Sequence, residues 1–451
     1  MNEARLIAFG KTTRPVTLVR LFGLDDSWLG FFMPLGFAPS PHGSMHPTYP
    51  AGLPMHLALA GIIGGWARAP FLIAPFAAVG CVFLVCFLSR RLGLPRSASS
   101  IAAAAMATLP PFLWHAVQPA SDVLATFWAL VAICCAFVAS ERPWAALAAG
   151  AAFGISVWVR PTNVLLLFPL VLALRLQIPL LVSAALGALP FGVSLMWWNS
   201  ALYSSPIRTG YGGFLPGLSW AGVRYAAPQH AEWLARMLSP IGFPGGLLVL
   251  WDRRCDLWVK SALIAWITAF FVFYSFYGFF DGYLCIRFLL PAIPALIIGA
   301  LLILRDAYAF FARHDRRLSL AIFSILALCI AVAPALSTWS LGVLQALPNM
   351  ERRYPDDVHW AEQLLPRRAV VITGVLSGPF LYYSNRSIIR YDQLNDERFQ
   401  TLRAYAGIHE LPWYAVVADS EIQHRELKER FRGRWTLIAN RNAISVYRLD
   451  S

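Results

Sequence analysis

The sequence predicts an all-α membrane domain of about ten helices followed by a small α/β domain outside the membrane. Of the 451 residues, 58% are hydrophobic and only 14% are charged, whereas a soluble protein carries roughly a quarter charged residues. Apolar runs recur as far as residue 345, and a polar tail follows them. We therefore divide the chain into an N-terminal segment with a first outer loop (1–69), a polytopic transmembrane domain (70–345) and an extracytoplasmic α/β domain (346–451).

The membrane domain consists of apolar runs that approach the length needed to cross a bilayer, about 20 residues. Some runs are short or are separated only by tight turns, so the expected number of spans is good to about one helix. The stretch 50–67 is also apolar, but Pro50 and Pro54 disturb its first turn, which favours an interfacial or re-entrant helix. The expected spans are 70–88, 98–116, 121–140, 144–159, 162–176, 178–198, 238–251, 258–280, 286–304 and 318–342.

Three clusters of basic residues in short loops set the orientation of these spans. Alternation from any one cluster places the other two on the same side, which the positive-inside rule makes cytoplasmic. The first outer loop and the polar tail then lie outside the cytoplasmic membrane. Much of the net charge of +13 belongs to these loops, so no nucleic-acid partner is expected. The clusters are Arg90, Arg91 and Arg96; Arg253, Arg254 and Lys260; and Arg305, Arg313, Arg316 and Arg317.

A long outer loop is expected between residues 199 and 239, and it is rich in Gly, Tyr and Trp. A loop of this length in a compact protein is usually functional or disordered. Its aromatic rings suit stacking on sugar rings, and they equally suit the interfacial belt of a membrane protein. Both interpretations stay open for Tyr203, Tyr211, Trp220 and Tyr225.

The polar tail alternates strands and helices, as is typical of a small α/β domain. Strands are expected at 369–373, 414–418 and 444–448, and helices at 356–365 and 419–431. The tail contains neither a glycine-rich phosphate loop nor a nucleophile elbow. We expect it to be a binding or structural lid.

Two arginines depart from the cytoplasmic pattern. Arg160 and Arg287 fall at the outer ends of expected spans, on the same side as Asp25 and Asp26. Each alone could be an interfacial arginine whose charged head reaches water, but an ionisable residue at membrane depth is by default a functional hypothesis. Because a guanidinium donates two parallel hydrogen bonds to phosphate, the pair is expected to bind an anionic lipid headgroup.

The adjacent carboxylates of Asp25 and Asp26 precede a loop rich in Pro, His and Tyr. Such a pair accepts a proton from a hydroxyl if burial and the neighbouring charge raise one pKa toward the working pH. With His42 and His46 close in sequence, the pair could instead hold Mn²⁺ or Mg²⁺. We expect no cofactor, with the divalent cation at Asp25 and Asp26 kept as the alternative.

Taken in order, these motifs resemble the GT-C superfamily of integral-membrane glycosyltransferases, which includes the protein O-mannosyltransferases of family 39 and the bacterial aminoarabinose transferase acting on lipid A. The resemblance covers about residues 25–345. Ala51 departs from the Tyr-Pro-Pro-Gly signature, and residues 1–24 supply no transmembrane helix before the aspartates. Either the fold lacks that helix or the true start lies upstream of Met1, and we expect the upstream start. The matching segments are Asp25-Asp26, His46 to Gly52, Gln118 to Asp122, Gly150 to Pro161, and Arg287 to Pro291.

The resemblance implies an inverting enzyme that moves a sugar from a polyprenyl-phosphate-linked donor to a hydroxyl of a lipid, glycan or protein acceptor outside the cytoplasmic membrane. The alternatives are a transporter or flippase for lipid-linked sugars, and a non-catalytic binding protein that keeps the fold. A transporter would carry ionisable residues in mid-span and paired broken helices, and the sequence shows neither. The residues implied are Asp25 or Asp26 as the general base, Arg160 and Arg287 for the donor phosphate, and Asp122, His46 and Tyr49 in support of the acceptor or the base.

Overall fold

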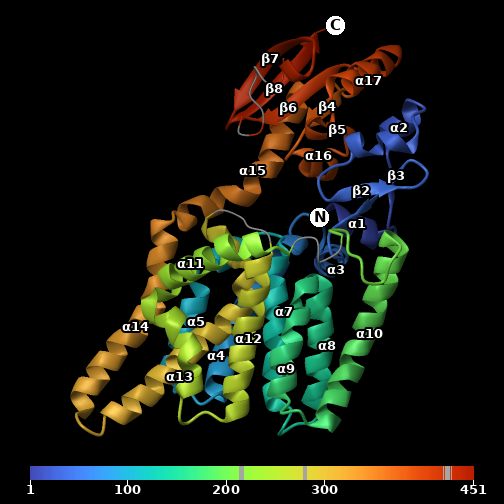
Figure 1. Cartoon of the computed structure of the whole chain (residues 1–451). Helices are drawn as coiled ribbons and strands as arrows, with labels where there is room; N and C mark the ends of the chain where they lie inside the picture. Colours follow the sequence, from blue (N-terminus) through green and yellow to red (C-terminus); the bar gives the residue numbers. More distant parts are fainter. Residues whose placement is uncertain (213–217, 278–281, 420, 422–426, 428, 451) are drawn as a thin grey trace. The chain divides into compact units, whose positions relative to one another are not determined.

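The computed structural model describes residues 1–212, 218–277, 282–419, 421, 427 and 429–450. The chain forms two compact units. The helical unit comprises Pro50–Arg208 and Gly212–Leu347, and the α/β unit comprises Met1–Tyr49, Thr209–Tyr211 and Pro348–Ser451. Each unit is described by itself (Figure 1).

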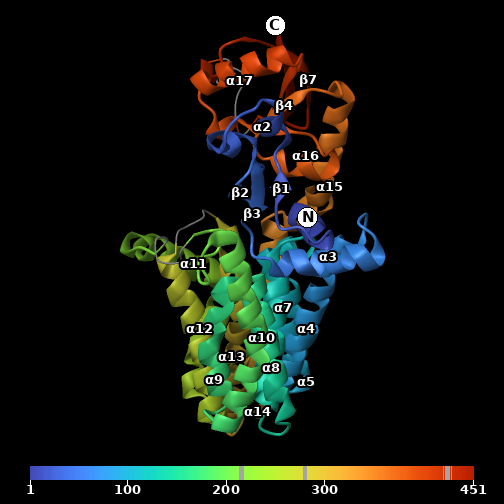
Figure 2. The same ribbon diagram turned by 90° about the vertical axis from the view of Figure 1, so that its right-hand side faces the viewer.

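The helical unit contains all the long apolar helices of the described chain. Figures 1 and 2 show α7, α8 and α10 of this unit side by side. Its elements are α3 (Gly52–Gly64), η2 (Ala69–Leu72), α4 (Ile73–Arg91), α5 (Arg96–Ala107), α6 (Pro110–Ala116), α7 (Ser121–Val138), α8 (Trp144–Val159), η3 (Pro161–Leu166), α9 (Leu167–Ala173), α10 (Ile178–Tyr203), α11 (Trp220–Leu247), η5 (Leu248–Trp251), α12 (Leu257–Phe276), η6 (Tyr283–Ala292), α13 (Ile293–Phe311), α14 (Arg316–Ser340) and the start of α15 (Val343–Leu364).

Seven helices among the described residues are long and apolar enough to cross a membrane. The polytopic class predicted from the sequence is therefore confirmed, while three of the expected spans do not form helices as long as these seven. The span expected at 98–116 is divided between α5 and α6, because Pro110 and Pro111 begin a new helix. Those at 144–159 and 162–176 correspond to the 16 residues of α8 and to η3 with α9.

The prediction of a continuous outer loop from residue 199 to 239 is wrong. Helix α10 continues to Tyr203, and α11 begins at Trp220. The Ser219 side chain accepts a hydrogen bond from the Gly222 amide at 3.0 Å and so caps the new helix. A break at Ser239, where φ is 70°, separates this amphipathic first part from the apolar part of α11. Trp220 and Tyr225 thus lie on a helix.

Small residues let the helix backbones approach closely. A Cβ on Gly150 of α8 would lie 1.8 Å from the Ala184 carbonyl oxygen of α10, and one on Gly187 of α10 would lie 2.1 Å from the Leu147 oxygen. Glycine at these positions is the usual device for tight packing of membrane helices, where the hydrophobic effect does not bring helices together.

A buried ion pair ties two turns to α13. Asp252 follows η5, is fully buried, and accepts hydrogen bonds from two backbone amides of its own turn at 2.8 and 2.7 Å. Arg305 of α13 donates from Nη2 to both oxygens of this carboxylate at 3.2 and 3.0 Å. Its Nη1 donates to the Gly93 carbonyl, in the turn between α4 and α5, at 3.1 Å. One side chain therefore holds both turns.

The α/β unit contains two sheets. The first has the order β1-β3-β2, and the second has the order β5-β4-β6-β8-β7, in which β4 runs parallel to β5 and β6 while β8 runs antiparallel to β6 and β7. The elements are α1 (Asn2–Ala8), β1 (Arg14–Pro15), α2 (Thr17–Leu21), η1 (Asp26–Phe32), β2 (Phe37–Ser40), β3 (Ser44–Pro47), the rest of α15, β4 (Val370–Thr373), α16 (Ser377–Tyr383), β5 (Ile388–Arg390), η7 (Tyr391–Gln393), α17 (Asp396–Ile408), β6 (Trp413–Ala418), β7 (Arg434–Arg441) and β8 (Ile444–Asp450).

The three expected strands of the tail correspond to β4, β6 and β8, and the helix expected at 356–365 is part of α15. Strand β5 has only three residues, and the sequence pattern predicted neither it nor β7, α16 and α17. Of the helix expected at 419–431, residues 420, 422–426 and 428 lie outside the described residues.

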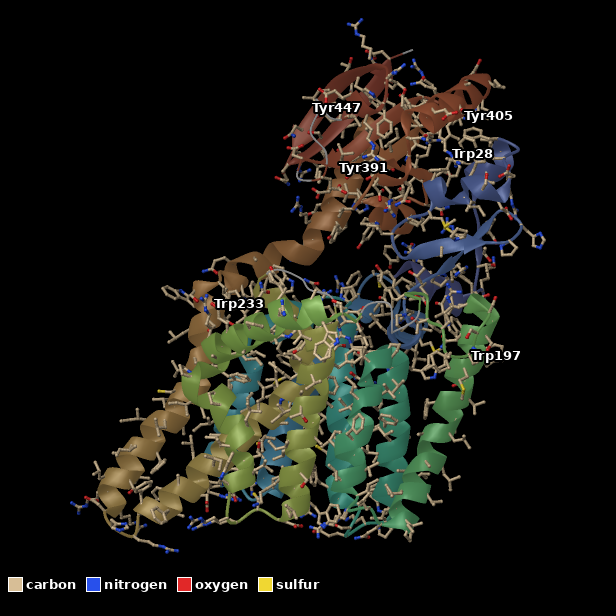
Figure 3. All side chains as sticks on the ribbon, in the orientation of Figure 1. Trp28, Trp197, Trp233, Tyr391, Tyr405 and Tyr447 are labelled. Carbon is tan, nitrogen blue, oxygen red and sulfur yellow. The ribbon has the colours of Figure 1, made fainter. Side chains whose placement is uncertain are left out.

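The first 49 residues share a hydrophobic core with the C-terminal sheet. The ring of Phe22 stacks on Tyr405 of α17 with centroids 5.9 Å apart. The guanidinium of Arg398, also on α17, lies 5.2 Å from the ring of Trp28. Figure 3 labels Trp28 and Tyr405 within this unit. The N-terminal segment, which the sequence analysis grouped with residues up to 69, thus packs on the C-terminal domain.

Candidate active site

Four ionisable side chains come together in the helical unit, and we call them the ionic cluster: Asp122, Arg160, Arg287 and His115. Arg160 Nη2 donates to Asp122 Oδ1 at 2.8 Å. His115 Nδ1 lies 3.8 Å from Asp122 Oδ2. Arg287 approaches through its backbone, since Arg160 Nη1 lies 3.4 Å from the Arg287 carbonyl oxygen. The sequence analysis named Asp122, Arg160 and Arg287 as candidate site residues, and the structure places them in one cluster.

Local sequence explains the position of Arg160. Helix α8 ends at Val159 because Pro161 forces the preceding residue out of the helical region, and Arg160 is extended with φ −145° and ψ 105°. The chain then turns into η3, where Asn163 donates to Ser156 Oγ at 2.6 Å and to the Ala125 carbonyl of α7 at 3.2 Å. These buried bonds fix the turn that carries Arg160 against the helix that carries Asp122.

An aromatic ring is shared by the two arginines. The ring centroid of Phe288 lies 5.3 Å from the guanidinium carbon of Arg160 and 4.8 Å from that of Arg287. Phe288 in turn stacks on Tyr274 of α12, whose hydroxyl hydrogen-bonds Thr162 at 2.6 Å. Because a cation over a desolvated ring is stabilised by the ring quadrupole, Phe288 favours both guanidiniums at this place.

Burial gives the cluster its electrostatic character. The exposed fractions of the Asp122 and Arg160 side chains are 6% and 12%. A buried ion pair is stable only where each charge is paired and hydrogen-bonded, and the 2.8 Å bond meets this condition. Among the described side chains of the cluster, two guanidiniums accompany one carboxylate, so these groups carry excess positive charge while His115 is neutral. This arrangement suits a further anion.

The backbone before Arg160 is packed against the first turn of α3. A Cβ on Gly52 would lie 2.4 Å from both the Trp158 carbonyl carbon and the Val159 nitrogen. Four residues on, His56 Nδ1 hydrogen-bonds the Gly52 carbonyl at 2.7 Å, and its Nε2 accepts from Trp128 Nε1 of α7 at 3.1 Å. The glycine of the Tyr-Pro-Ala-Gly stretch is therefore a support for the end of α8.

Asp25 and Asp26 belong to the α/β unit, where both carboxylates bind backbone amides. Asp25 caps η1 by accepting from the Ser27 amide at 2.8 Å. Asp26 accepts from the His42 amide at 3.1 Å and the Gly43 amide at 2.8 Å, one bond to each oxygen. Both of these turn residues have positive φ, 62° and 65°, so their successive amides form a small anion nest in the β2–β3 turn.

These bonds bear on acid–base chemistry. The hydrogen bonds from Ser27 hold the pKa of Asp25 below its ordinary value, because they favour the charged form. The sequence analysis made the base role conditional on burial and the neighbouring carboxylate raising one of the two pKa values, and the pKa of Asp25 is lowered instead.

The two carboxylates already serve backbone amides of their own loops. Both oxygens of Asp26 and one of Asp25 already accept backbone hydrogen bonds. In the described part of the chain, no three His, Cys, Asp or Glu side chains gather closely enough to hold a metal ion. No step of the chemistry below uses one.

His46 and Tyr49 lie on and just after β3. His46 pairs with Ala38 of β2, and its partial burial holds the pKa of the imidazole below the ordinary value. The Tyr49 ring packs on Gly36, where a Cβ would lie 2.1 Å from it, and it meets Tyr211 edge to face at 5.9 Å. These two tyrosines thus form a partly exposed aromatic surface within the α/β unit.

Sequence reasoning missed His115 and the supporting role of Gly52. His115 lies near the end of α6, and Asp122 lies in the first turn of α7. Only a turn separates them in the sequence, and the Gln118-Pro119 turn between two apolar helices was the available signal. Gly52 contacts residues more than a hundred positions away, and no local pattern reports such a contact.

Comparison with known proteins identifies the fold. No family model matches the sequence, and no curated protein matches it. Among solved structures, ArnT from Cupriavidus metallidurans bound to undecaprenyl phosphate aligns with a TM-score of 0.54 and 14% identity, over 89% of this chain and 88% of that one. The apo form of the same protein aligns with a TM-score of 0.53 and 15% identity, over 97% of this chain and 94% of that one. The arabinofuranosyltransferase AftD from Mycobacteria aligns with a TM-score of 0.52 and 14% identity, over 99% of this chain and 41% of that one.

These likenesses extend along nearly the whole chain, over the polytopic helical unit and the α/β unit alike, at low sequence identity. The resemblance inferred from short motifs and the likeness of the folded chain agree. The chain has the fold of the GT-C glycosyltransferases.

Proposed function

We propose that the protein transfers a sugar from a polyprenyl-phosphate-linked donor to a hydroxyl acceptor at the outer face of the cytoplasmic membrane. The observation that carries the proposal is the ionic cluster, in which a buried carboxylate meets two partly buried arginines among apolar helices. The GT-C fold and the undecaprenyl phosphate of the ArnT complex support it. The membrane location rests on the apolar helices, and the outward orientation rests on the basic loops of the sequence.

In the proposed reaction, Arg160 and Arg287 bind the donor phosphate. The acceptor oxygen forms a bond to the anomeric carbon while the bond from that carbon to the phosphate oxygen breaks, and the electron pair leaves with the phosphate. The guanidiniums stabilise the charge that develops on this leaving group, and such stabilisation is commonly the largest catalytic term. Asp122 keeps Arg160 in place through their 2.8 Å bond. Attack opposite the leaving group inverts the anomeric centre.

The acceptor proton goes to a carboxylate of the first loop, Asp25 or Asp26. Asp25 is the better candidate, because its recorded hydrogen bond uses Oδ1 whereas those of Asp26 use both oxygens. Its lowered pKa makes it a weak base that is ionised at neutral pH. His46 and Tyr49 are proposed to contact the acceptor.

The test is a transfer assay in membranes with a panel of radiolabelled polyprenyl-phosphate pentoses and hexoses. We expect Arg160→Gln and Arg287→Gln to lower transfer by at least about a hundredfold, since each removes a donor that stabilises the leaving group. Arg142→Gln, an exposed arginine in the turn before α8, is the matched control and should leave transfer unchanged. Wild-type rates in both cluster variants would refute the phosphate assignment, and donor binding without transfer would favour a non-catalytic binding protein.

A further inference from the structure

His115 is a buried histidine that the proposed reaction does not use. It lies in the last turn of α6 and is 3% exposed. Neither ring nitrogen has a hydrogen-bond partner among the described residues. An imidazole without partners is costly to bury, so its position beside Asp122 needs a reason.

Among the described residues, the charges that act on His115 belong to the ionic cluster. They are Asp122, at 3.8 Å, and the guanidiniums of Arg287 and Arg160. Helix α6 packs against α4, α5, α7, α14 and η6. The other titratable side chains of these elements are thiols, the hydroxyl of Tyr283, and arginines at the far ends of their helices, namely Arg90, Arg91, Arg96, Arg316 and Arg317.

Asp122 stands between two cationic or potentially cationic groups. Its Oδ1 is bonded to Arg160, while its Oδ2 faces His115. When a phosphate binds Arg160, a second anion comes close to this carboxylate, and like charges at such distances repel strongly in a buried site. A proton on His115 would offset this repulsion, and it would hold Asp122 in place while Arg160 bonds to the phosphate.

We propose that His115 is a positioning residue that takes up one proton when an anionic phosphate binds the ionic cluster, so that donor binding is coupled to protonation. The inference rests on the phosphate site of the proposed function. In this step one proton moves from solvent to a nitrogen of the His115 imidazole. The imidazolium pairs with Asp122 Oδ2, and no other covalent bond changes. On phosphate release the proton returns to solvent.

The probe is the methyl ester of undecaprenyl phosphate, a phosphodiester that stays singly charged and so contributes no titration of its own. Its binding to the full chain in lipid nanodiscs is measured by calorimetry between about pH 5 and 8, the range in which histidine ordinarily changes charge. Repeating the titration in two buffers of different ionisation enthalpy counts the protons taken up. We expect wild-type affinity to weaken by up to about tenfold per pH unit in the upper part of this range, with uptake of close to one proton.

His115→Gln should bind the diester with little pH dependence and no proton uptake, at an affinity close to that of the wild type at high pH. His230→Gln is the matched control, because His230 is also a buried histidine of the helical unit, on α11, and lies against Phe271. It should keep the wild-type slope. His115→Asn serves as a second variant if the glutamine chain does not fold.

Unchanged proton uptake in His115→Gln would overturn the inference, as would tight wild-type binding with no proton uptake. If the wild type does not bind the diester at all, the phosphate site itself is refuted and the inference fails with it. Loss of binding in Arg160→Gln alongside intact binding in His115→Gln separates these outcomes, because only the first variant removes a phosphate ligand.

Discussion

Replacing Gly52 by alanine tests whether the first turn of α3 sets the position of Arg160. The new Cβ would lie 2.4 Å from the Trp158 carbonyl carbon and the Val159 nitrogen, whereas ordinary van der Waals contact begins at 3.4 Å. Both neighbours are backbone atoms, so no side-chain rotation relieves the clash. The end of α8 must move away by on the order of 1 Å, and Arg160 is the next residue along the chain.

This displacement should affect both the stability of the protein and the rate of transfer. Overpacking of this kind typically costs about 1–3 kcal/mol of stability. A displacement of about 1 Å in a group that positions the substrate can lower the rate by about a hundredfold. We therefore expect Gly52→Ala to lower the melting midpoint of the purified protein and to reduce transfer by about ten- to a hundredfold.

The control is Gly192→Ala in α10, where an added Cβ meets nothing within 4 Å. Alanine in a helix interior is more stable than glycine by about 0.5–1 kcal/mol, so this variant should melt at or above the wild-type temperature with normal transfer. Equal transfer rates in Gly52→Ala and wild type would refute the argument that Gly52 positions Arg160. Equal melting midpoints would refute the packing argument itself.

Three further predictions concern carboxylates. Because the pKa of Asp25 is held below its ordinary value, its charged form persists to lower pH. We therefore expect kcat/KM to fall only below about pH 4. A fall in kcat/KM near neutral pH would exclude Asp25 as the base. Asp26→Ala removes the acceptor of two turn amides, so it should lower stability by about 1–2 kcal/mol and raise proteolytic cleavage in the β2–β3 turn. Cleavage at the wild-type rate would contradict the role of Asp26 in holding this turn. Asp252→Asn breaks the buried pair with Arg305 and should cost about 3–5 kcal/mol of stability in thermal unfolding. The control is Asp256→Asn, because the half-exposed ion pair of Asp256 is worth under about 1 kcal/mol. Equal losses of stability in the two variants would contradict the role of the buried pair.

Hydropathy was a sound guide to the helical unit because crossing a bilayer requires a local property, a long apolar run. It failed for residues 220–238, where α11 begins as an amphipathic helix with no such run. That helix depends on the Ser219 cap and on the bond from the Ser219 amide to the Phe276 carbonyl at 2.9 Å. The second of these is a tertiary contact, and no window of sequence contains it.

In the α/β unit, the central strands β4 and β6 were predictable because they are buried on both faces and read as apolar runs. Strand β7 lies at the edge of the sheet and is mostly exposed, with Trp435 as its buried residue, and β5 is too short to show a period. The packing of the first 49 residues on this sheet joins segments more than 300 positions apart. The composition of either segment alone does not predict it.

Arg160 and Arg287 stood out in the sequence by themselves, because a charge beside an apolar span is conspicuous. Their pairing with Asp122 did not, since Asp122 and Arg160 lie 38 residues apart, and His115 meets Asp122 only through the packing of α6 on α7. Asp25 and Asp26 were equally conspicuous. Whether they act as bases depends on amides that fold beside them, 2 residues away for Asp25 and 16 and 17 residues away for Asp26.

The sequence by itself determined the membrane class, most of the apolar helices and the ionisable residues worth testing, because each of these follows from the chemistry of short segments. The tertiary structure decided which ionisable residues meet, which are buried and which carboxylates already serve the backbone. These properties depend on distance and solvent access, which arise only when remote segments pack together. The ionic cluster at the end of α8 is the result, and it is the site that the proposed function requires.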